Sequence, residues 1–355
     1  MKALVLSGGR GTRLRPITHT SAKQLVPVAN KPILFYAIEA VKAARIDDIG
    51  IVVGDTRAEI KAACGDGSAF GCRITYIEQE APLGIAHGVK IAQPFLGEEP
   101  FVLYLGDNLI KDGITPLVDE FRAGGYNAQI LLAHVRNPRQ FGVAELDDSG
   151  QIVRLEEKPA HPKTDLALVG VYMFDPSIFE AVAAIQPSAR GELEITEAIQ
   201  YLIDHGRKVH SHIVTGYWKD TGRLDDLLEA NRIMLGTVQT RLDGEVDDAS
   251  AVHGVVQLAR GAKLIRSVVR APAVIGQNTV IEDAYVGPFT SIYHDCHIRA
   301  SEIEHSIVLE QSKVLDIRAR IEDSLIGKSV TVHRKDGKPS AYRLMLGDSS
   351  EVCLP

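Results

Sequence analysis

The chain has 355 residues, of which 45 % are hydrophobic and 24 % charged, and its formal net charge is −7. This composition is typical of a globular protein with one large domain and a smaller one. The acidic balance and the lack of a basic run argue against nucleic acid as a partner. No apolar run reaches the length of a membrane span, and no cleaved signal is expected before the first strand. A cytoplasmic protein without a membrane partner is therefore expected.

Short apolar runs alternate with helical stretches over residues 1–238. "KALVLS" precedes a glycine-rich loop and a helix from about Ile33 to Ile46, and further strands are "DIGIVVG", "RITYIEQ", "FVLYLGD" and "AQILLAHV". This alternation predicts βαβ units and an α/β domain with a doubly wound, mostly parallel sheet. "FGVAELDDSGQIVRLEEKP" interrupts the pattern and predicts a hairpin with an Asp-Ser-Gly turn. Two more helices are expected, one within "GELEITEAIQYLIDHG" and one within "GRLDDLLEANRIML".

The hydrophobic spacing changes after about Val246. Val269, Val286 and Ile303 are separated by 17 residues, an interval that neither a helix nor an alternating strand produces. It predicts a short-coil parallel β-helix whose apolar corners stack on one another. The pattern loosens after Leu315 and returns at Ile326 and Val332, and "YRLMLGDSSEV" is expected to close the open coil. We therefore predict two domains, 1–238 and 239–355.

The loop "LSGGRGTRLRPIT" places three glycines and three arginines at the end of the first strand. A Walker A loop is excluded because Thr12 and Arg13 follow Gly11, and the dinucleotide fingerprint is excluded because Leu14 stands at its third glycine. Bare backbone N–H groups bind phosphate, and two cations, Arg13 and Lys23, suit the charge of a leaving pyrophosphate. A plain turn with solvated arginines is the alternative, but a turn does not need so many cations.

Five motifs stand in a fixed order: "GGRGTRLRPIT…AKQLVPVANKP", "LGDN", "LEEKP", "RGELEIT" and "WKDTG". In this order the chain resembles the sugar-1-phosphate nucleotidylyltransferases over essentially its whole length. It is most similar to the long-form glucose-1-phosphate thymidylyltransferases, which carry a C-terminal left-handed β-helix. The resemblance implies Mg²⁺-dependent transfer of a thymidylyl group from dTTP to glucose-1-phosphate. The products would be pyrophosphate and dTDP-glucose, for deoxysugar biosynthesis, and a homo-oligomer is expected.

The resemblance also assigns the site residues. The implied metal ligands are Asp107 and Asp220, which end apolar strands, and one or two carboxylates with substrate phosphates suit Mg²⁺. The residues expected to be catalytic are Arg13, Lys23, Asp107 and Lys158. Those expected around the nucleotide are Leu6, Gly8, Gly9, Gly11, Thr12, Arg13, Gln24, Gln79 and Gly84. Those expected around the sugar phosphate are Gly142, Glu157, Lys158, Gly170 and Arg190.

Two further expectations concern specificity and chemistry. The amides of Gln24 and Gln79 can pair with a pyrimidine, but uracil offers the same edge as thymine, so UTP stays open. No general base is needed, because a phosphate with a second pKa of about 6 is already ionised at neutral pH.

Two alternatives remain. Left-handed β-helices often occur in acyltransferases, so His294, His297 and His305 could serve a second, acetyl-transferring site; this rests on fold analogy alone. The other alternative is an inactive scaffold that senses nucleotide sugars. The presence of Arg13, Lys23 and both aspartates argues against it.

Overall fold

The computed structural model describes residues 1–9, 11–19, 21–335 and 342–353. The chain divides into two compact units. The first contains Met1–Arg10, Ala22–Leu25 and Ile33–Asp220, and the second contains Gly11–Ser21, Val26–Pro32 and Thr221–Pro355. Among the described residues, no helix combines the length and the apolar character that crossing a membrane requires.

The first unit is built on one sheet whose central strands are parallel. In spatial order these strands are β6 (Phe101–Leu105), β1 (Lys2–Ser7), β4 (Asp48–Val53) and β5 (Arg73–Glu78). Their pairing is parallel and in register, with Val5 between Ile51 and Tyr104. Because β1 has later strands on both sides, the strand order reverses there, and the carboxyl ends of these strands form the edge where doubly wound sheets bind ligands.

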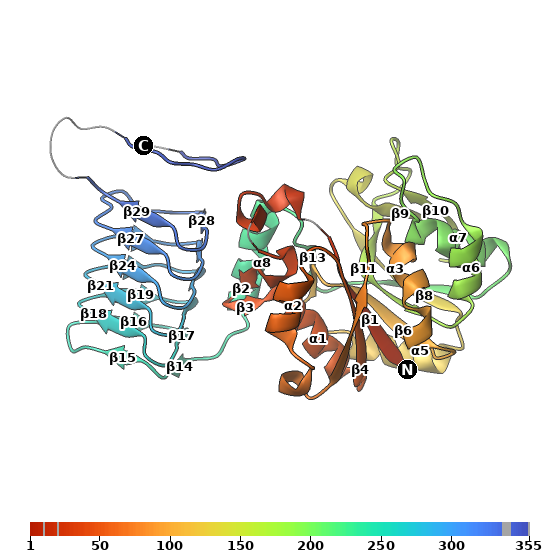
Figure 1. The fold of residues 1–355 in the computed structure, drawn as a ribbon, viewed down its shortest axis with the longest axis horizontal. Helices are drawn as coiled ribbons and strands as arrows, with labels where there is room; N and C mark the ends of the chain where they lie inside the picture. Colours follow the sequence, from red (N-terminus) through yellow and green to blue (C-terminus); the bar gives the residue numbers. More distant parts are fainter. Residues whose placement is uncertain (10, 20, 336–341, 354–355) are drawn as a thin grey trace. The chain divides into compact units, whose positions relative to one another are not determined.

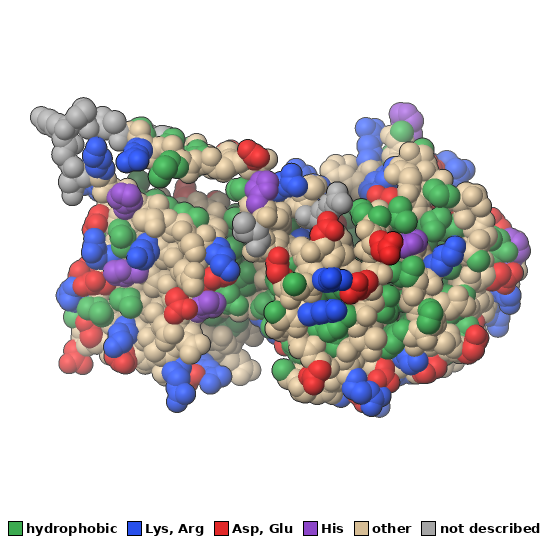
Figure 2. Space-filling model, viewed as in Figure 1, with side chains coloured by type: hydrophobic (Ala, Val, Ile, Leu, Met, Phe, Trp, Pro, Cys, Tyr) green, Lys and Arg blue, Asp and Glu red, His purple; other side chains and the backbone are tan. Residues whose placement is uncertain are grey.

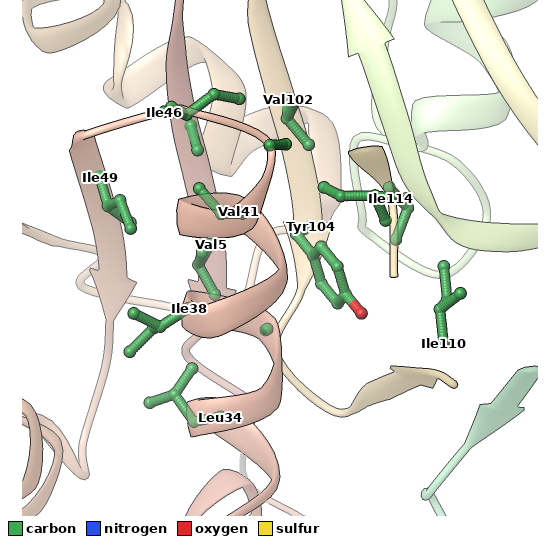
Figure 3. Close-up of a cluster of buried hydrophobic side chains, with 14 of the residues drawn as sticks. Val5, Leu34, Ile38, Val41, Ile46, Ile49, Val102, Tyr104, Ile110 and Ile114 are labelled. Atoms are coloured by element: carbon green, nitrogen blue, oxygen red, sulfur yellow. The ribbon is translucent and has the colours of Figure 1, made fainter. Parts of the chain in front are cut away.

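Helices cover both faces of this sheet. On one face α1 (Ile33–Ala43) buries Leu34, Ile38 and Val41 against the strands, as Figure 3 shows. The other helices of the unit are α2 (Arg57–Cys64), α3 (Ile85–Ile91), α4 (Gln93–Leu96), α5 (Thr115–Gly124), α6 (Ile178–Ala184) and α7 (Ile195–Asp204). The opposite face holds a second apolar cluster that includes Phe101, Phe174 and the buried side of α7. Burial on both faces explains why β6, β1 and β4 are largely apolar runs.

An antiparallel part extends the sheet beyond β6. Its strands are β8 (Ala128–His134), β9 (Gly142–Leu146), β10 (Ile152–Glu157), β11 (Leu166–Phe174) and β12 (Val209–Ile213). Strand β11 runs antiparallel to β6, β8 and β9. The predicted β9–β10 hairpin is present, and Asp147 forms its turn by accepting hydrogen bonds from the backbone of Ser149 and Gln151, both at 2.9 Å. A separate two-stranded ribbon pairs β7 (Asn108–Ile110) with β13 (Trp218–Asp220).

The second unit is a parallel β-helix with three sheets, and Figure 1 shows its coils stacked on one another. One sheet contains β14 (Arg241–Leu242), β17 (Val256–Leu258), β20 (Ala273–Ile275), β23 (Thr290–Ile292), β26 (Ile307–Val308) and β28 (Leu325–Ile326). The next contains β15 (Glu245–Val246), β18 (Lys263–Ile265), β21 (Val280–Glu282), β24 (His297–Arg299), β27 (Lys313–Leu315) and β29 (Thr331–His333). The third contains β16 (Ala251–His253), β19 (Val268–Arg270), β22 (Tyr285–Val286) and β25 (Glu302–Ile303).

The register of these strands confirms the predicted repeat. Val269 pairs with Val286, which pairs with Ile303. Ile326 and Val332 continue their columns, as predicted. The fold class, a doubly wound α/β domain followed by a left-handed β-helix, is thus confirmed. Figure 2 shows charged and histidine side chains on the outside of the coils. Arg320 and Glu302, both about half exposed, form an ion pair.

Several short segments outside the coils belong to the second unit. They are the 3₁₀ turns η1 (Thr12–Leu14) and η2 (Ile17–His19), the hairpin of β2 (Pro27–Val28) and β3 (Lys31–Pro32), and α8 (Leu224–Leu235). Helix α8 packs against β2 and against β23. The boundary after residue 238 stays a prediction.

The C-terminal segment has no regular secondary structure. Residues 342–353 contain no helix or strand, and Tyr342 and Met345 are 71 % and 85 % exposed. Closure of the last coil by this segment stays a prediction. The segment lacks the five- to six-residue spacing of Val and Ile, so it offers no corner that could stack on the coil below.

The stacked corners predict where the β-helix is most sensitive to substitution. Ile298 is fully buried between Ile281 and Val314 of the neighbouring coils. Ile298→Ala should lower the free energy of unfolding by about 3 kcal/mol, because it leaves a cavity that the coils cannot close. Urea denaturation of the full chain measures this. The exposed Lys313→Ala is the control and should change stability little; equal effects of the two would contradict the stacking argument.

Candidate active site

The glycine-rich loop begins where β1 ends, and two predicted glutamines border it. A Cβ atom added to Gly8 would lie 3.2 Å from Gln79 Oε1, and one added to Gly9 would lie 3.8 Å from Gln24 Nε2. The Leu6 carbonyl accepts a hydrogen bond from Gly106 N at 2.9 Å, which ties β1 to the residue before Asp107. The structure thus brings Gly8, Gly9 and both glutamines to one edge of the sheet.

This edge contains buried polar atoms without partners. Gln24 is 3 % exposed, and its Oε1 accepts no hydrogen bond from any described residue; the same holds for Ser7 Oγ. Buried polar atoms are nearly always paired, and those that are not often mark a ligand site. A ligand that donates hydrogen bonds here would satisfy Gln24.

His87, on the first turn of α3, holds the amide of Gln79 and was not expected from the sequence. Gln79 Nε2 lies 2.9 Å from His87 Nδ1 and 3.4 Å from the Gly84 carbonyl. An amide nitrogen only donates, so Nδ1 accepts and the neutral ring carries its proton on Nε2. Burial, together with Lys90, lowers the pKa of His87, which favours this neutral form. Gln79 Oε1 is left facing Gly8.

Gly84 connects Gln79 to the "RGELEIT" loop. Its φ is +103°, and an added Cβ would lie 2.4 Å from the Leu193 carbonyl oxygen. Leu193 N donates to the Leu83 carbonyl at 2.8 Å, and Ala86 N donates to the Leu193 carbonyl at 3.1 Å. Close packing against Leu193 therefore requires glycine here, whereas contact of Gly84 with a base stays a prediction.

Lys23 and Asp107 form an ion pair at the carboxyl end of β6. Lys23 belongs to η3 (Lys23–Leu25) and is 8 % exposed, and its Nζ contacts Asp107 Oδ2. Burial opposes ionisation of Asp107, but the charge of Lys23 and hydrogen bonds from Lys23 and Asn108 outweigh it. The pKa of the Asp107 carboxyl is therefore lowered, and the group is ionised.

Asn108, which the sequence reading left without a role, is the polar centre of this region. Its Nδ2 donates to Asp107 Oδ1 at 3.0 Å, while its Oδ1 accepts from Trp218 Nε1 at 2.7 Å and from Gly170 N at 3.2 Å. An added Cβ at Gly170 would lie 2.6 Å from this amide. Gly170 therefore makes room for Asn108, not for an open space, and its contact with a sugar stays a prediction.

The β7–β13 ribbon brings the second predicted metal ligand to the first. In the antiparallel register Asp220 pairs with Asn108, the residue after Asp107. The backbone register thus places two carboxylates that are 113 positions apart in sequence at the same end of the ribbon. Mg²⁺ is usually held by one or two carboxylates, with water and substrate phosphates as its other ligands. This donor set fits that ion, and no group of three or more His, Cys, Asp or Glu in the described ranges offers an all-protein metal site.

A second charged cluster joins "LEEKP" to "RGELEIT". Arg190 donates to Glu157 Oε1 at 3.2 Å and to Glu192 Oε2 at 2.7 Å, and its Nη1 lies 3.5 Å from Glu194 Oε1. Lys158 Nζ lies 3.4 Å from the same Glu157 oxygen. Desolvation opposes the charge of Arg190, but three carboxylates outweigh it and raise its pKa. Arg190 and Lys158 therefore lie next to Glu157, the carboxylate that is expected to bind sugar hydroxyls.

Glu194 and Gly142 complete this cluster. Glu194 is buried, and Ser188 Oγ donates to it at 2.8 Å; desolvation raises the pKa of this carboxyl. A Cβ at Gly142 would lie 2.6 Å from Thr196 Cγ2 and 3.0 Å from Glu157 Oε2. Glycine at 142 thus lets Thr196 of α7 and the side chain of Glu157 lie close to the backbone of β9.

The remaining predicted residues lie in the second unit. Gly11 has a φ of +62°, and its carbonyl accepts hydrogen bonds from Leu14 N at 2.9 Å and Thr18 Oγ1 at 2.6 Å. Thr12 and Arg13 are exposed. The place of these three residues beside phosphates stays a prediction. His294, His297 and His305 lie on different turns or strands of the coils, where the nearest carboxylates are Asp295, Glu282 and Asp323, respectively.

Known proteins are similar to this chain over its whole length. Residues 2–236 match the family model described as Nucleotidyl transferase. The glucose-1-phosphate thymidylyltransferases of Streptomyces griseus and Streptomyces antibioticus are 59 % and 57 % identical over 352 and 353 residues, which is 99 % of each chain. A solved Bacillus anthracis structure assigned to the same enzymes has a TM-score of 0.62 at 36 % identity, over 66 % of this chain and 94 % of that one. The resemblance read from the motifs is confirmed, and the chain belongs to the nucleotidyl transferase family of enzymes.

Proposed function

We propose that this enzyme transfers a thymidylyl group from dTTP to glucose-1-phosphate, giving dTDP-glucose and pyrophosphate. The observation on which this rests is the arrangement at the edge of the sheet. The Lys23–Asp107 pair lies beside Asp220 in the strand register, and the glycines of the loop lie beside two glutamines. The names of the two Streptomyces relatives support the choice of substrates.

The residues act by alignment and charge neutralisation. The attacking oxygen belongs to a phosphate that is ionised at neutral pH, so no side chain has to remove a proton. Lys158 and Arg190 would hold that phosphate, and Glu157 would accept hydrogen bonds from sugar hydroxyls. Lys23 and Arg13 would neutralise the charge that develops on the leaving pyrophosphate.

Asp107 and Asp220 would hold Mg²⁺ together with the nucleotide phosphates. When bound, this ion supplies charge for the phosphates and holds them in line for displacement. Lys23 neutralises Asp107 in the structure described here, so the buried carboxylate has a counter-charge before substrate binds. The two glutamines would read the pyrimidine edge, with Gln79 oriented by His87.

The reaction is tested with a matrix of nucleoside triphosphates and sugar-1-phosphates in the presence of Mg²⁺. We expect dTTP with glucose-1-phosphate to give the fastest pyrophosphate release. UTP is included because it shares the hydrogen-bonding edge of thymine. Clearly faster release from ATP or GTP would contradict the assignment of Gln24 and Gln79 to the base.

The metal assignment predicts the effect of Asp107→Asn. The amide is a poor ligand for Mg²⁺ and no counter-charge for Lys23, so kcat/KM should fall about a hundredfold or more. Steady-state pyrophosphate release measures this, and circular dichroism checks that the variant is folded. Asp148→Asn, in the exposed turn of the β9–β10 hairpin, is the matched control and should keep full activity. A folded Asp107→Asn enzyme with normal turnover would remove Asp107 from the metal site.

The Gln79–His87 hydrogen bond predicts that nucleotide binding weakens at acid pH. The bond needs neutral His87, so it is present at neutral pH and is lost as the pH falls through the lowered pKa of His87. The KM for dTTP should therefore rise severalfold toward acid pH. His87→Gln keeps an acceptor for Gln79 but does not titrate, so its KM should rise less. If the KM for dTTP depends on pH in the same way in the wild-type and His87→Gln enzymes, its rise at acid pH is caused by the substrate phosphates instead.

A further inference from the structure

Part of the phosphate-binding sequence is folded into the β-helix unit. The chain leaves the first unit after Leu25, two residues beyond Lys23, forms the β2–β3 hairpin within the second unit, and returns at Ile33. The loop Gly11–Ser21 also belongs to the second unit, where a Cβ at Gly327 of the coils would lie 3.3 Å from Ile17 Cδ1. The segment that carries Lys23 is therefore bounded on both sides by chain that the second unit holds.

One buried asparagine on α8 joins this hairpin to the coils. Asn231 is 1 % exposed, and its Oδ1 accepts hydrogen bonds from the hairpin amide Ala29 N at 2.8 Å and from Ser291 Oγ on β23 at 2.6 Å. Its Nδ2 donates to the Phe289 carbonyl at 3.1 Å. The side chain of Asn231 thus links α8 to both the hairpin and β23. Hydrogen bonds fix the relative orientation of these elements more strictly than apolar packing would.

The hairpin adds its own bond to the same coil. Asn30 Nδ2 donates to the Ile292 carbonyl at 2.7 Å, at the end of β23. Both tip residues are left-handed, with φ of +49° at Ala29 and +58° at Asn30. A left-handed backbone is strained at an alanine and persists only where surrounding contacts hold it. The bond from Ala29 N to Asn231 is such a contact, and the neighbouring Val28 is fully buried.

We infer that Asn231 is a positioning residue for Lys23, so that the β-helix helps to set the geometry of nucleotidyl transfer. The inference rests on the proposed function for the role of Lys23. Anchoring at Ala29 and Asn30 restrains the hairpin, and Val26 joins that hairpin directly to η3. Lys23 must face both Asp107 and a phosphate, and misplacing a catalytic group by about 1 Å can cost up to a hundredfold in rate.

The experiment compares full-length variants. Asn231→Ala removes the bond to the hairpin together with the two bonds to the coils. Asn30→Gly removes the second anchor while keeping a residue that accepts a left-handed backbone. Ser267→Ala is the matched control, because Ser267 is equally buried and bridges the Ile265 carbonyl (2.8 Å) and Ala284 N (3.1 Å) on coils without a bond to the hairpin. Each variant is assayed well below its own midpoint of thermal unfolding.

For Asn231→Ala we expect kcat to fall by about tenfold or more with little change in the KM for glucose-1-phosphate. Asn30→Gly should show a smaller loss of the same kind, and Ser267→Ala should lose thermal stability without losing kcat. Hydrogen–deuterium exchange over residues 22–32 should rise in the first two variants but not in the control. If Asn231→Ala does not fold, Asn30→Gly and its exchange pattern decide the question.

A kcat for Asn231→Ala that matches Ser267→Ala would overturn the inference, and so would unchanged exchange over residues 22–32. Failure of the proposed function looks different. In that case the wild-type chain releases no pyrophosphate from any pair in the substrate matrix, while the exchange data still report whether the hairpin is anchored.

Discussion

The pairing of Lys23 with Asp107 is the constraint on which the rest of the site depends. Both groups are largely buried, and burying either charge alone would be costly. The pair is tolerated because additional hydrogen bonds share the charge: Asn108 donates to Asp107, and Trp218 and Gly170 hold Asn108 in place. The ribbon that contributes Trp218 also brings Asp220 into register. One set of contacts thus stabilises a buried charge and assembles the carboxylates.

The cluster around Arg190 follows the same principle. Glu157, Glu192 and Glu194 surround the guanidinium, so its position is fixed without a ligand. Under the proposed function, a sugar phosphate bound there would replace carboxylate contacts rather than water, and little rearrangement of the cation would be needed. Leu193 connects this cluster to the loop that contains Gly84. Its backbone hydrogen bonds to Leu83 and Ala86 fix that loop.

The sequence predicted the features that depend on local spacing or on a motif. The 17-residue interval gave the coils, and the motifs gave Lys23, Asp107 and Arg190. It missed α6 (Ile178–Ala184) and β11 (Leu166–Phe174), because a seven-residue helix and a fully buried strand have no distinctive period. It also missed Asn108 and His87. Asn108 acquires its role through Trp218, which is far away in the sequence, and His87 acquires its role through Gln79, which lies outside α3.

Asn231 illustrates the same limit on a larger scale. On the helical pattern of α8 it stands among buried positions such as Leu227 and Ala230, where an apolar residue would pack equally well. The stacking of the coils explains why the residues of β23 are buried. It does not supply a hydrogen-bond partner for the hydroxyl of Ser291. The asparagine is accounted for only when the hairpin is added, because the left-handed amide of Ala29 needs an acceptor that no regular strand supplies. A buried polar residue inside an apolar stripe therefore marks a contact that brings distant segments together, and here one of those segments continues directly into Lys23.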